Sequence, residues 1–321
     1  MRALITGCAG FAGSHLADHL LERDEEIIAL VGPGEGRANI RHIEEHLRIE
    51  SADLRDQDRV LEVVRSTKPQ RIYHLAALSS PVESLRKPEL TYQVNFMGTL
   101  NLLLAWRRLD IDCRLLFVSS SEVYGVVSAE HLPLHEDASP CPDNPYAGSK
   151  MAGEILCLQF CQSYGLPIVR VRPFSHTGPR QSGNFVCSSL ARQLAEIDEG
   201  LRPGKVVTGN LEVKRDFSDV RDIVRGYSLL LEKGRPGEVY QLCSGRAVSI
   251  HYIAQVLASM ASKPVQIEVD QSQVRNNDCP EVRGDYSKAR SAVGWQPRHE
   301  LQATLRDLKL YWQERLHSHQ V

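Results

Sequence analysis

Short apolar segments that alternate with helical segments occupy the first half of this 321-residue sequence. The expected strands are Arg2–Thr6, Glu26–Val31, Leu47–Ser51, Arg71–Leu75, Leu115–Ser119 and Ile168–Val171. The expected helices between them include Ser14–Arg23, Arg55–Ser66, Val94–Leu109 and Ala147–Ser163. Strands that are apolar along their whole length and are joined through helices indicate a parallel sheet covered on both faces. The pattern therefore predicts an α/β fold with a doubly wound parallel sheet and right-handed crossovers.

The second half of the sequence is less regular. After a Gly- and Pro-rich loop at Pro173–Gly183, we expect helices at Asn184–Gly200, Asp219–Leu231, Ile250–Ser262 and Leu301–His317. We expect strands at Lys205–Thr208 and Val239–Leu242, and the second of these returns to the main sheet. This order predicts a nucleotide-binding domain formed by residues 1–167 and 222–247. Residues 168–221 and 248–321 are expected to form a smaller, interleaved α/β substrate lobe.

Composition excludes several classes of protein. The 38 basic and 40 acidic side chains give a formal charge of −2, without the basic surplus of a dedicated nucleic-acid binder. No run of roughly 18 apolar residues is available to span a membrane, and the first strand begins without a signal peptide ahead of it. The eight cysteines form no CxxC pair and are expected to be core residues rather than metal ligands. We therefore expect a cytoplasmic protein without a metal site.

Three glycines follow the first strand and lead into the first helix. Gly7, Gly10 and Gly13, with Phe11 and Ala12 between them, allow a tight turn and a close approach of the backbone to a pyrophosphate. The pyrophosphate would lie at the positive end of the helix dipole. The context of strand, turn and helix predicts a Rossmann-type cofactor loop rather than an ordinary turn.

The GxxGxxG spacing of this loop resembles that of the extended short-chain dehydrogenases/reductases. The resemblance implies that Asp53 and Leu54 contact the adenine ring of the cofactor. It also implies that Leu75, Ala76 and Ala77 line the cofactor with their backbone, although either set matches ordinary strand ends. Asn95 matches a helix asparagine of the family and is interpreted as architectural support.

The residue at the end of the second strand selects between NAD and NADP. An acidic side chain there would bind the ribose hydroxyls of NAD, but the strand ends in Leu30 and Val31. Arg37 follows shortly and is able to pair with a 2′-phosphate, unless it is only a solvated loop residue. We expect NADPH/NADP as the cofactor, with NADH left open.

Tyr146 and Lys150 lie four residues apart, on one face at the start of an expected helix. A free tyrosine with a pKa of about 10 is a poor acid or base at neutral pH. A nearby cation favours the phenolate and lowers that pKa. The family resemblance implies that Lys150 also bonds the nicotinamide ribose.

The segment from Ser119 to Gly125 follows the fifth strand, where parallel sheets present their ligand sites. In the extended family, the hydroxyl at the position of Ser120 bonds the reacting oxygen. Glu122 occupies the position at which the 4,6-dehydratases carry an acid that removes the C5 proton. Reductases of the family also carry an acid there, and hydrogen bonding within the turn is a further role for Glu122.

Segments of the second half, including RPFSHTGPRQS at 172–182 and the run from Gly209 to Asp222, resemble the GDP-6-deoxy-4-keto-mannose reductases. The resemblance implies that Arg215 and Arg275 bind the sugar diphosphate, that Asp278 binds the ribose, and that Phe185 and Val186 cover the base. The full set of implied substrate contacts is Ser79, Ser175, Phe185, Val186, Arg192, Arg215, Arg275 and Asp278. Two positions depart from the family pattern, because Ser175 replaces an asparagine and Asp278 replaces a glutamate.

Together these features predict NADPH-dependent reduction of the C4 keto group of a GDP-4-keto-6-deoxy-hexose, such as GDP-4-keto-6-deoxy-D-mannose, to give GDP-D-rhamnose. Tyr146 is the expected acid/base. The alternatives are a GDP-mannose 4,6-dehydratase or another NDP-sugar dehydratase or epimerase that uses Glu122, and a non-catalytic NADP-binding regulatory protein. Family resemblance also implies a homodimer formed through the Val94–Leu109 and Tyr146–Ser163 helices, although their apolar faces are equally consistent with packing inside one chain.

Overall fold

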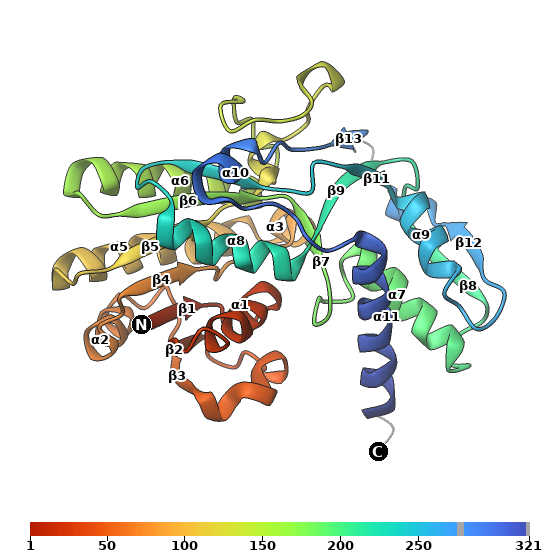
Figure 1. Ribbon diagram of the computed structural model, residues 1–321, viewed down its shortest axis with the longest axis horizontal. Helices are drawn as coiled ribbons and strands as arrows, with labels where there is room; N and C mark the ends of the chain where they lie inside the picture. Colours follow the sequence, from red (N-terminus) through yellow and green to blue (C-terminus); the bar gives the residue numbers. More distant parts are fainter. Residues whose placement is uncertain (275–278, 319–321) are drawn as a thin grey trace.

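A computed structural model describes residues 1–274 and 279–318. Within this part of the chain, seven strands form the predicted parallel sheet, in the order β10-β6-β5-β4-β1-β2-β3 (Figure 1). These strands are β1 (Arg2–Thr6), β2 (Glu26–Val31), β3 (Leu47–Ser51), β4 (Arg71–His74), β5 (Arg114–Val118), β6 (Ile168–Pro173) and β10 (Val239–Leu242). Every neighbouring pair is parallel. The Rossmann-type α/β prediction is confirmed, and so is the return of β10 to the main sheet.

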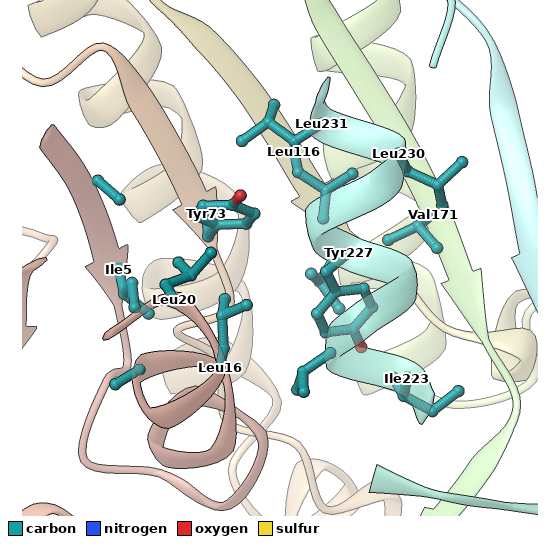
Figure 2. Close-up of a cluster of buried hydrophobic side chains, with 14 of the residues drawn as sticks. Ile5, Leu16, Leu20, Tyr73, Leu116, Val171, Ile223, Tyr227, Leu230 and Leu231 are labelled. Atoms are coloured by element: carbon teal, nitrogen blue, oxygen red, sulfur yellow. The ribbon is translucent and has the colours of Figure 1, made fainter. Parts of the chain in front are cut away.

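Helices cover both faces of this sheet, as continuous apolar strands require. The helices of this part are α1 (Phe11–Leu21), α2 (Gln57–Thr67), α3 (Pro81–Arg86), α4 (Pro88–Tyr92), α5 (Gly98–Leu109), α6 (Pro145–Tyr164), α8 (Val220–Lys233) and α10 (Ser287–Val293). Helices α1, α8 and α10 bury their apolar sides against one face, where Leu16 and Leu20 of α1 and Tyr227 of α8 meet the strands (Figure 2). Helices α2, α5 and α6 cover the opposite face.

The smaller lobe contains short strands and three longer helices. Its elements are β7 (Ser175–Thr177), β8 (Lys205–Thr208), β9 (Lys214–Asp219), β11 (Ala247–Ser249), β12 (Gln266–Val269), β13 (Glu281–Val282), α7 (Val186–Asp198), α9 (Ile250–Ala258) and α11 (Leu301–Ser318). Strand β9 pairs with β7, β11 and β13, and β8 pairs with β12. Helices α7, α9 and α11 enclose a separate apolar core beside these strands (Figure 1).

Two segments lie elsewhere than the predicted domain division suggested, and the division itself stays a prediction. Strand β6, expected in the substrate lobe, pairs with β5 and β10 in the large sheet. Helix α10, also expected in that lobe, packs on α8 and β10 and places Trp295 in the core of the large sheet. Both differences have one cause, because the apolar residues of these segments complete the larger core.

The cysteine prediction is correct for most positions. All eight cysteines are free, and six of them are buried, including Cys157 on α6. Cys161, one turn later, is only partly buried, and Cys141 is exposed on a loop between two prolines. Within the described residues, no helix is long and apolar enough to cross a membrane.

Candidate active site

The glycine loop joins β1 to α1 and permits two close backbone approaches. A Cβ atom on Gly13 would lie 2.1 Å from the carbonyl oxygen of Gly7. Gly7 has a φ of +71°, in the left-handed region that favours glycine, and its Cβ position lies 2.9 Å from Cα of Ala76. The loop thus lies directly against the segment that follows β4, as the cofactor prediction requires.

The first turn of α1 leaves its positive end available to a ligand. Gly10 is the N-cap residue, no side chain caps the turn, and no acidic residue lies in it. A helix N-terminus without such partners is suited to bind a phosphate. The Gly7–Gly13 cradle, which Cβ atoms would fill, therefore fits a dinucleotide pyrophosphate.

The predicted adenosine contacts lie at the ends of β2 and β3. Asp53 and Leu54 follow β3, and Arg55 forms an ion pair with Asp53 at 2.6 Å. The Arg55 guanidinium lowers the pKa of the Asp53 carboxyl, chiefly through this hydrogen bond. Arg37 is exposed beyond β2 and pairs with Glu44 at 3.1 Å. Its assignment to a 2′-phosphate stays a prediction.

Tyr146 lies in the first turn of α6, which Asn144 caps by accepting from the backbone N–H of Ala147. The phenol is buried and shares a hydrogen bond with Ser120. Burial raises the pKa of the Tyr146 phenol to about 12, although the Ser120 hydrogen bond acts in the opposite direction. The structure therefore brings together the predicted acid/base and the predicted oxygen-binding hydroxyl.

Lys150 lies one turn later on α6 and is also buried. Its Nζ donates to the carbonyl oxygen of Val118 at 2.8 Å. Burial lowers the pKa of the Lys150 ammonium to about 8. We expected this cation to lower the pKa of Tyr146, but that pKa is raised instead, because desolvation of the phenol dominates.

Glu122 is an exposed residue of the 3₁₀ helix Ser121–Tyr124. Its backbone N–H donates to Oγ of Ser120 at 3.1 Å. Its carboxylate is close enough to raise the pKa of Tyr146 by charge repulsion. Glu122 thus lies beside the Ser120–Tyr146 pair, where both of the roles considered for it remain open.

Asn95 lies in a π-helical turn, Gln93–Met97, that precedes α5. Its amide accepts from the N–H of Leu78, donates to the carbonyl of Leu78, and donates to Oγ of Ser149 at 2.9 Å. These bonds join the segment after β4 to α6, and they agree with an architectural role.

The implied substrate contacts lie at the boundary with the smaller lobe. Ser175 begins β7, directly after β6, and Arg215 lies on β9, where its guanidinium donates to the carbonyl of Cys279 at 2.7 Å. Phe185 is the N-cap residue of α7, and Val186 is the first residue of that helix. Arg192 lies further along α7 and forms an ion pair with Glu196. Ser79 is exposed in the segment after β4. Arg275 and Asp278 lie outside the described residues, and all these substrate assignments stay predictions.

Two further features of the site were not predicted from the sequence. The buried carboxylate of Glu154 binds Arg172 in a bidentate pair, with both distances 2.8 Å. The ring of His176 stacks on Phe11 of the glycine loop, with centroids 5.7 Å apart. Glu154 follows Lys150 by four residues, the same spacing that relates Lys150 to Tyr146, and this repeat is the sequence signal that was available.

Comparisons with known proteins agree with this geometry. A family model described as GDP-mannose 4,6 dehydratase matches residues 4–308. The GDP-6-deoxy-D-mannose reductase of Pseudomonas aeruginosa is 34% identical over 98% of this chain and 98% of its own length. The GDP-mannose 4,6-dehydratase of Yersinia enterocolitica is 28% identical over 92% of this chain and 89% of its own.

A solved structure extends the comparison to the fold. The structure of RMD from Pseudomonas aeruginosa complexed with NADPH has a TM-score of 0.87 to this chain and 35% identity. The match covers 98% of this chain and 99% of that one. The chain therefore belongs to the GDP-mannose 4,6-dehydratase family and is an NAD(P)-dependent enzyme of the extended short-chain dehydrogenase/reductase type.

Proposed function

We propose that this enzyme reduces the C4 keto group of a GDP-4-keto-6-deoxy-hexose with NADPH, converting GDP-4-keto-6-deoxy-D-mannose to GDP-D-rhamnose. The observation that carries the proposal is the Tyr146 phenol, which is buried, bonded to Ser120 and held in its protonated form. Reduction of a ketone requires a proton donor at the oxygen, which this group provides. Similarity to the Pseudomonas reductase over nearly the whole chain supports the same direction.

Residues of the large sheet would hold the cofactor. The Gly7–Gly13 loop and the first turn of α1 fit the pyrophosphate. We expect Asp53 and Leu54 to contact the adenine ring and the backbone of residues 75–77 to line the cofactor. When bound, NADPH supplies the hydride that reduces the ketone carbon.

The side chains of the site then act on the ketone oxygen. Ser120 donates a hydrogen bond that holds and polarises the oxygen, and Tyr146 transfers its proton to it as negative charge develops. Lys150 keeps an ammonium near the phenolate that remains, which favours the transfer. After turnover Tyr146 recovers a proton, because the pKa of its phenol lies far above neutral pH.

The GDP-sugar assignment depends on the smaller lobe. Arg215 lies on β9, and its guanidinium donates to the carbonyl oxygen of Cys279. A guanidinium matches the oxygen pairs of a diphosphate in a bidentate manner. Ser175 begins β7 and Phe185 is the N-cap residue of α7, and we expect both to contact the substrate.

A 4,6-dehydratase is the second candidate, and Glu122 favours it. Its carboxylate lies beside the Ser120–Tyr146 pair, where it is able to accept a proton from the sugar. A dehydratase begins by oxidising C4, which requires Tyr146 as a base. The high pKa of the phenol works against that first step, because little phenolate is available at neutral pH to act as a base.

One assay separates the two candidates. Purified enzyme is incubated with NADPH and GDP-4-keto-6-deoxy-D-mannose, and separately with GDP-mannose and a catalytic amount of NADP⁺, while absorbance at 340 nm is followed and each product is analysed. We expect stoichiometric loss of NADPH with the keto sugar and a GDP-6-deoxyhexose whose C4 configuration is that of rhamnose. A 4-keto product from GDP-mannose without loss of NADPH would instead establish the dehydratase.

The same proposal includes a cytoplasmic homodimer. Exposed apolar side chains lie along one group of helices: Leu85 on α3, Tyr92 on α4, Met97 before α5, and Ile155 and Tyr164 on α6. Exposed apolar residues that gather on neighbouring helices are typical of an association surface. Eight free cysteines fit a reducing compartment.

A further inference from the structure

A buried ion pair joins α6 to the end of β6, immediately beside the active site. Glu154 is fully buried on α6, two turns after Tyr146. Its two carboxylate oxygens accept from Nε and Nη2 of Arg172, each at 2.8 Å. Arg170 on the same strand approaches Glu154 to 3.8 Å. The pair is fixed in position, because a bidentate, desolvated guanidinium–carboxylate contact allows little rotation.

The carboxylate also holds the end of β5. Oγ of Ser119 donates to Glu154 at 2.5 Å, and the Ser119 N–H donates to the carbonyl of Val171 at 2.8 Å. Ser119 is the residue directly before Ser120. The position of the Ser120 hydroxyl relative to Tyr146 therefore depends on how Glu154 anchors the preceding residue.

Arg172 extends the same network to the other side of Ser120. Its Nη1 donates to the phenol oxygen of Tyr124 at 2.8 Å, and Gln241 on β10 donates to that oxygen as well. Tyr124 ends the 3₁₀ helix that starts at Ser121. Ser120 is thus held from the residue before it by Glu154, and from the turn after it through Arg172.

Glu154 further affects the second side chain of the site, Lys150, which lies one turn before it. The titratable groups that interact electrostatically with Lys150 include Cys157 and Glu154 on α6 and the buried His74 on β4, and Tyr146 lies one turn before Lys150 on α6. Burial lowers the pKa of Lys150 to about 8, and electrostatic interactions with Cys157 and then with the negative charge of Glu154 oppose that shift. Loss of this charge would lower the pKa of Lys150 further, so the ammonium would be lost at a lower pH.

We propose that Glu154, locked by Arg172, is a positioning residue that fixes Ser120 against Tyr146 and maintains the ammonium of Lys150. Its effect on turnover rests on the proposed reductase function, whereas its effect on Lys150 does not. The network lies on α6 and at the ends of β5 and β6, whereas the glycine loop and Arg215 belong to other elements, and we therefore expect the binding of NADPH and sugar at neutral pH to be preserved when it is weakened.

Two variants and one control test this role. Ser119→Ala removes a single hydrogen bond and leaves the ion pair intact, whereas Glu154→Gln keeps the shape of the side chain and removes its charge. Glu25→Gln is the matched control, because Glu25 is a buried carboxylate paired with Arg71 at 2.6 Å, at the opposite, amino-terminal edge of the sheet. Turnover, KM for the keto sugar and the dissociation constant of NADPH are measured across pH for each variant.

We expect kcat to fall about tenfold in Ser119→Ala and about 100-fold in Glu154→Gln, with KM within about twofold of the wild type. In Glu154→Gln, the alkaline loss of kcat and of NADPH affinity should begin at a lower pH than in the wild type. The control should lose thermal stability only.

The measurement of NADPH affinity does not depend on the identity of the sugar, so it remains informative if the sugar assignment is wrong. Should the wild type fail to oxidise NADPH with the keto sugar, the proposed function fails, and the pH dependence of NADPH affinity still decides whether Glu154 acts on Lys150. If NADPH affinity depends on pH in the same way in Glu154→Gln and in Glu25→Gln, the proposed effect of Glu154 on Lys150 is wrong. If Glu154→Gln does not fold, unchanged kcat in Ser119→Ala overturns the positioning of Ser120.

Discussion

The Tyr146 phenol and the Lys150 ammonium are both buried, and burial changes their proton affinities in opposite directions. It raises the pKa of the phenol to about 12 and lowers the pKa of the ammonium to about 8. Desolvation disfavours whichever form carries charge, so the neutral phenol is favoured over the phenolate and the neutral amine over the ammonium. At neutral pH the site therefore holds a protonated phenol next to an ammonium that is close to losing its proton.

Replacement of Tyr146 by phenylalanine tests the proton-donor role directly. Tyr146→Phe removes only the hydroxyl, and we expect kcat to fall by about 10²- to 10⁴-fold, the usual contribution of a general acid. NADPH affinity should change little, since the glycine loop is untouched. Turnover is measured as loss of absorbance at 340 nm with the keto sugar.

Tyr252→Phe serves as the control for this substitution. Tyr252 lies on α9 in the smaller lobe, is partly exposed and accepts a hydrogen bond from Gln302. Its loss should leave kcat unchanged. Near-normal turnover in Tyr146→Phe would remove Tyr146 from the mechanism.

Sequence patterns singled out the side chains that the structure gathers at the candidate site, Ser120, Tyr146 and Lys150, but not the residues that support them. The spacing of Tyr146 and Lys150, and the place of Ser120 after a strand, are local features of the chain, and the structure brings these residues together. Glu154 shares that spacing, but its partners Ser119 and Arg172 are separated from it by 35 and 18 residues. The spacing of residues within one helix does not indicate which strand that helix will pack against.

At the scale of the elements, the Gly7–Gly13 turn gives a sharp prediction. In Gly13→Ala the new Cβ would lie 2.1 Å from a backbone oxygen, so the turn must open. We expect the dissociation constant of NADPH to rise at least about tenfold, equivalent to about 1.4 kcal/mol. Calorimetric titration with NADPH measures it, and circular dichroism checks that the fold is kept.

Gly36→Ala is the matched control, because a Cβ at Gly36 meets no atom within 4 Å. It introduces the same methyl group into the loop after β2 and should bind NADPH as the wild type does. Equal affinities for the two variants would show that the turn is not the pyrophosphate site.

The strands of the large sheet were predictable because burial on both faces makes them continuously apolar. The bounds of β1, β2, β3, β8 and β10 match the expected ranges. Strand β9, with the sequence KRDFSD, was missed because it has no continuous apolar run: its buried residues include Asp216, which accepts from Ser244 and Gly245, and Asp219, which accepts from Arg221 and Thr304. Strands β7, β11 and β13 have two or three residues and form only through pairing with β9, a non-local contact.

For the whole molecule, the proposed homodimer predicts the mass of the protein in solution. Ile155 is 58% exposed on α6, and a glutamate there would place a charge in an apolar interface. We expect the wild type to sediment as a dimer of the 36.0 kDa chain and Ile155→Glu to sediment as a monomer. Leu201→Glu, at a residue that is 55% exposed beyond α7, should leave the mass unchanged. A monomeric wild type would contradict the dimer.

The path of the chain between its two apolar cores has a consequence for how such an enzyme evolves. The chain leaves the large sheet after β6, returns to it as α8 and β10, leaves again for β11, and returns once more as α10 (Figure 1). No single crossover point separates a cofactor module from a substrate module, so recombination has no clean junction at which to exchange one for the other. New specificity must then arise by substitution within loops such as 173–183, while the fold that carries the hydride chemistry is inherited whole.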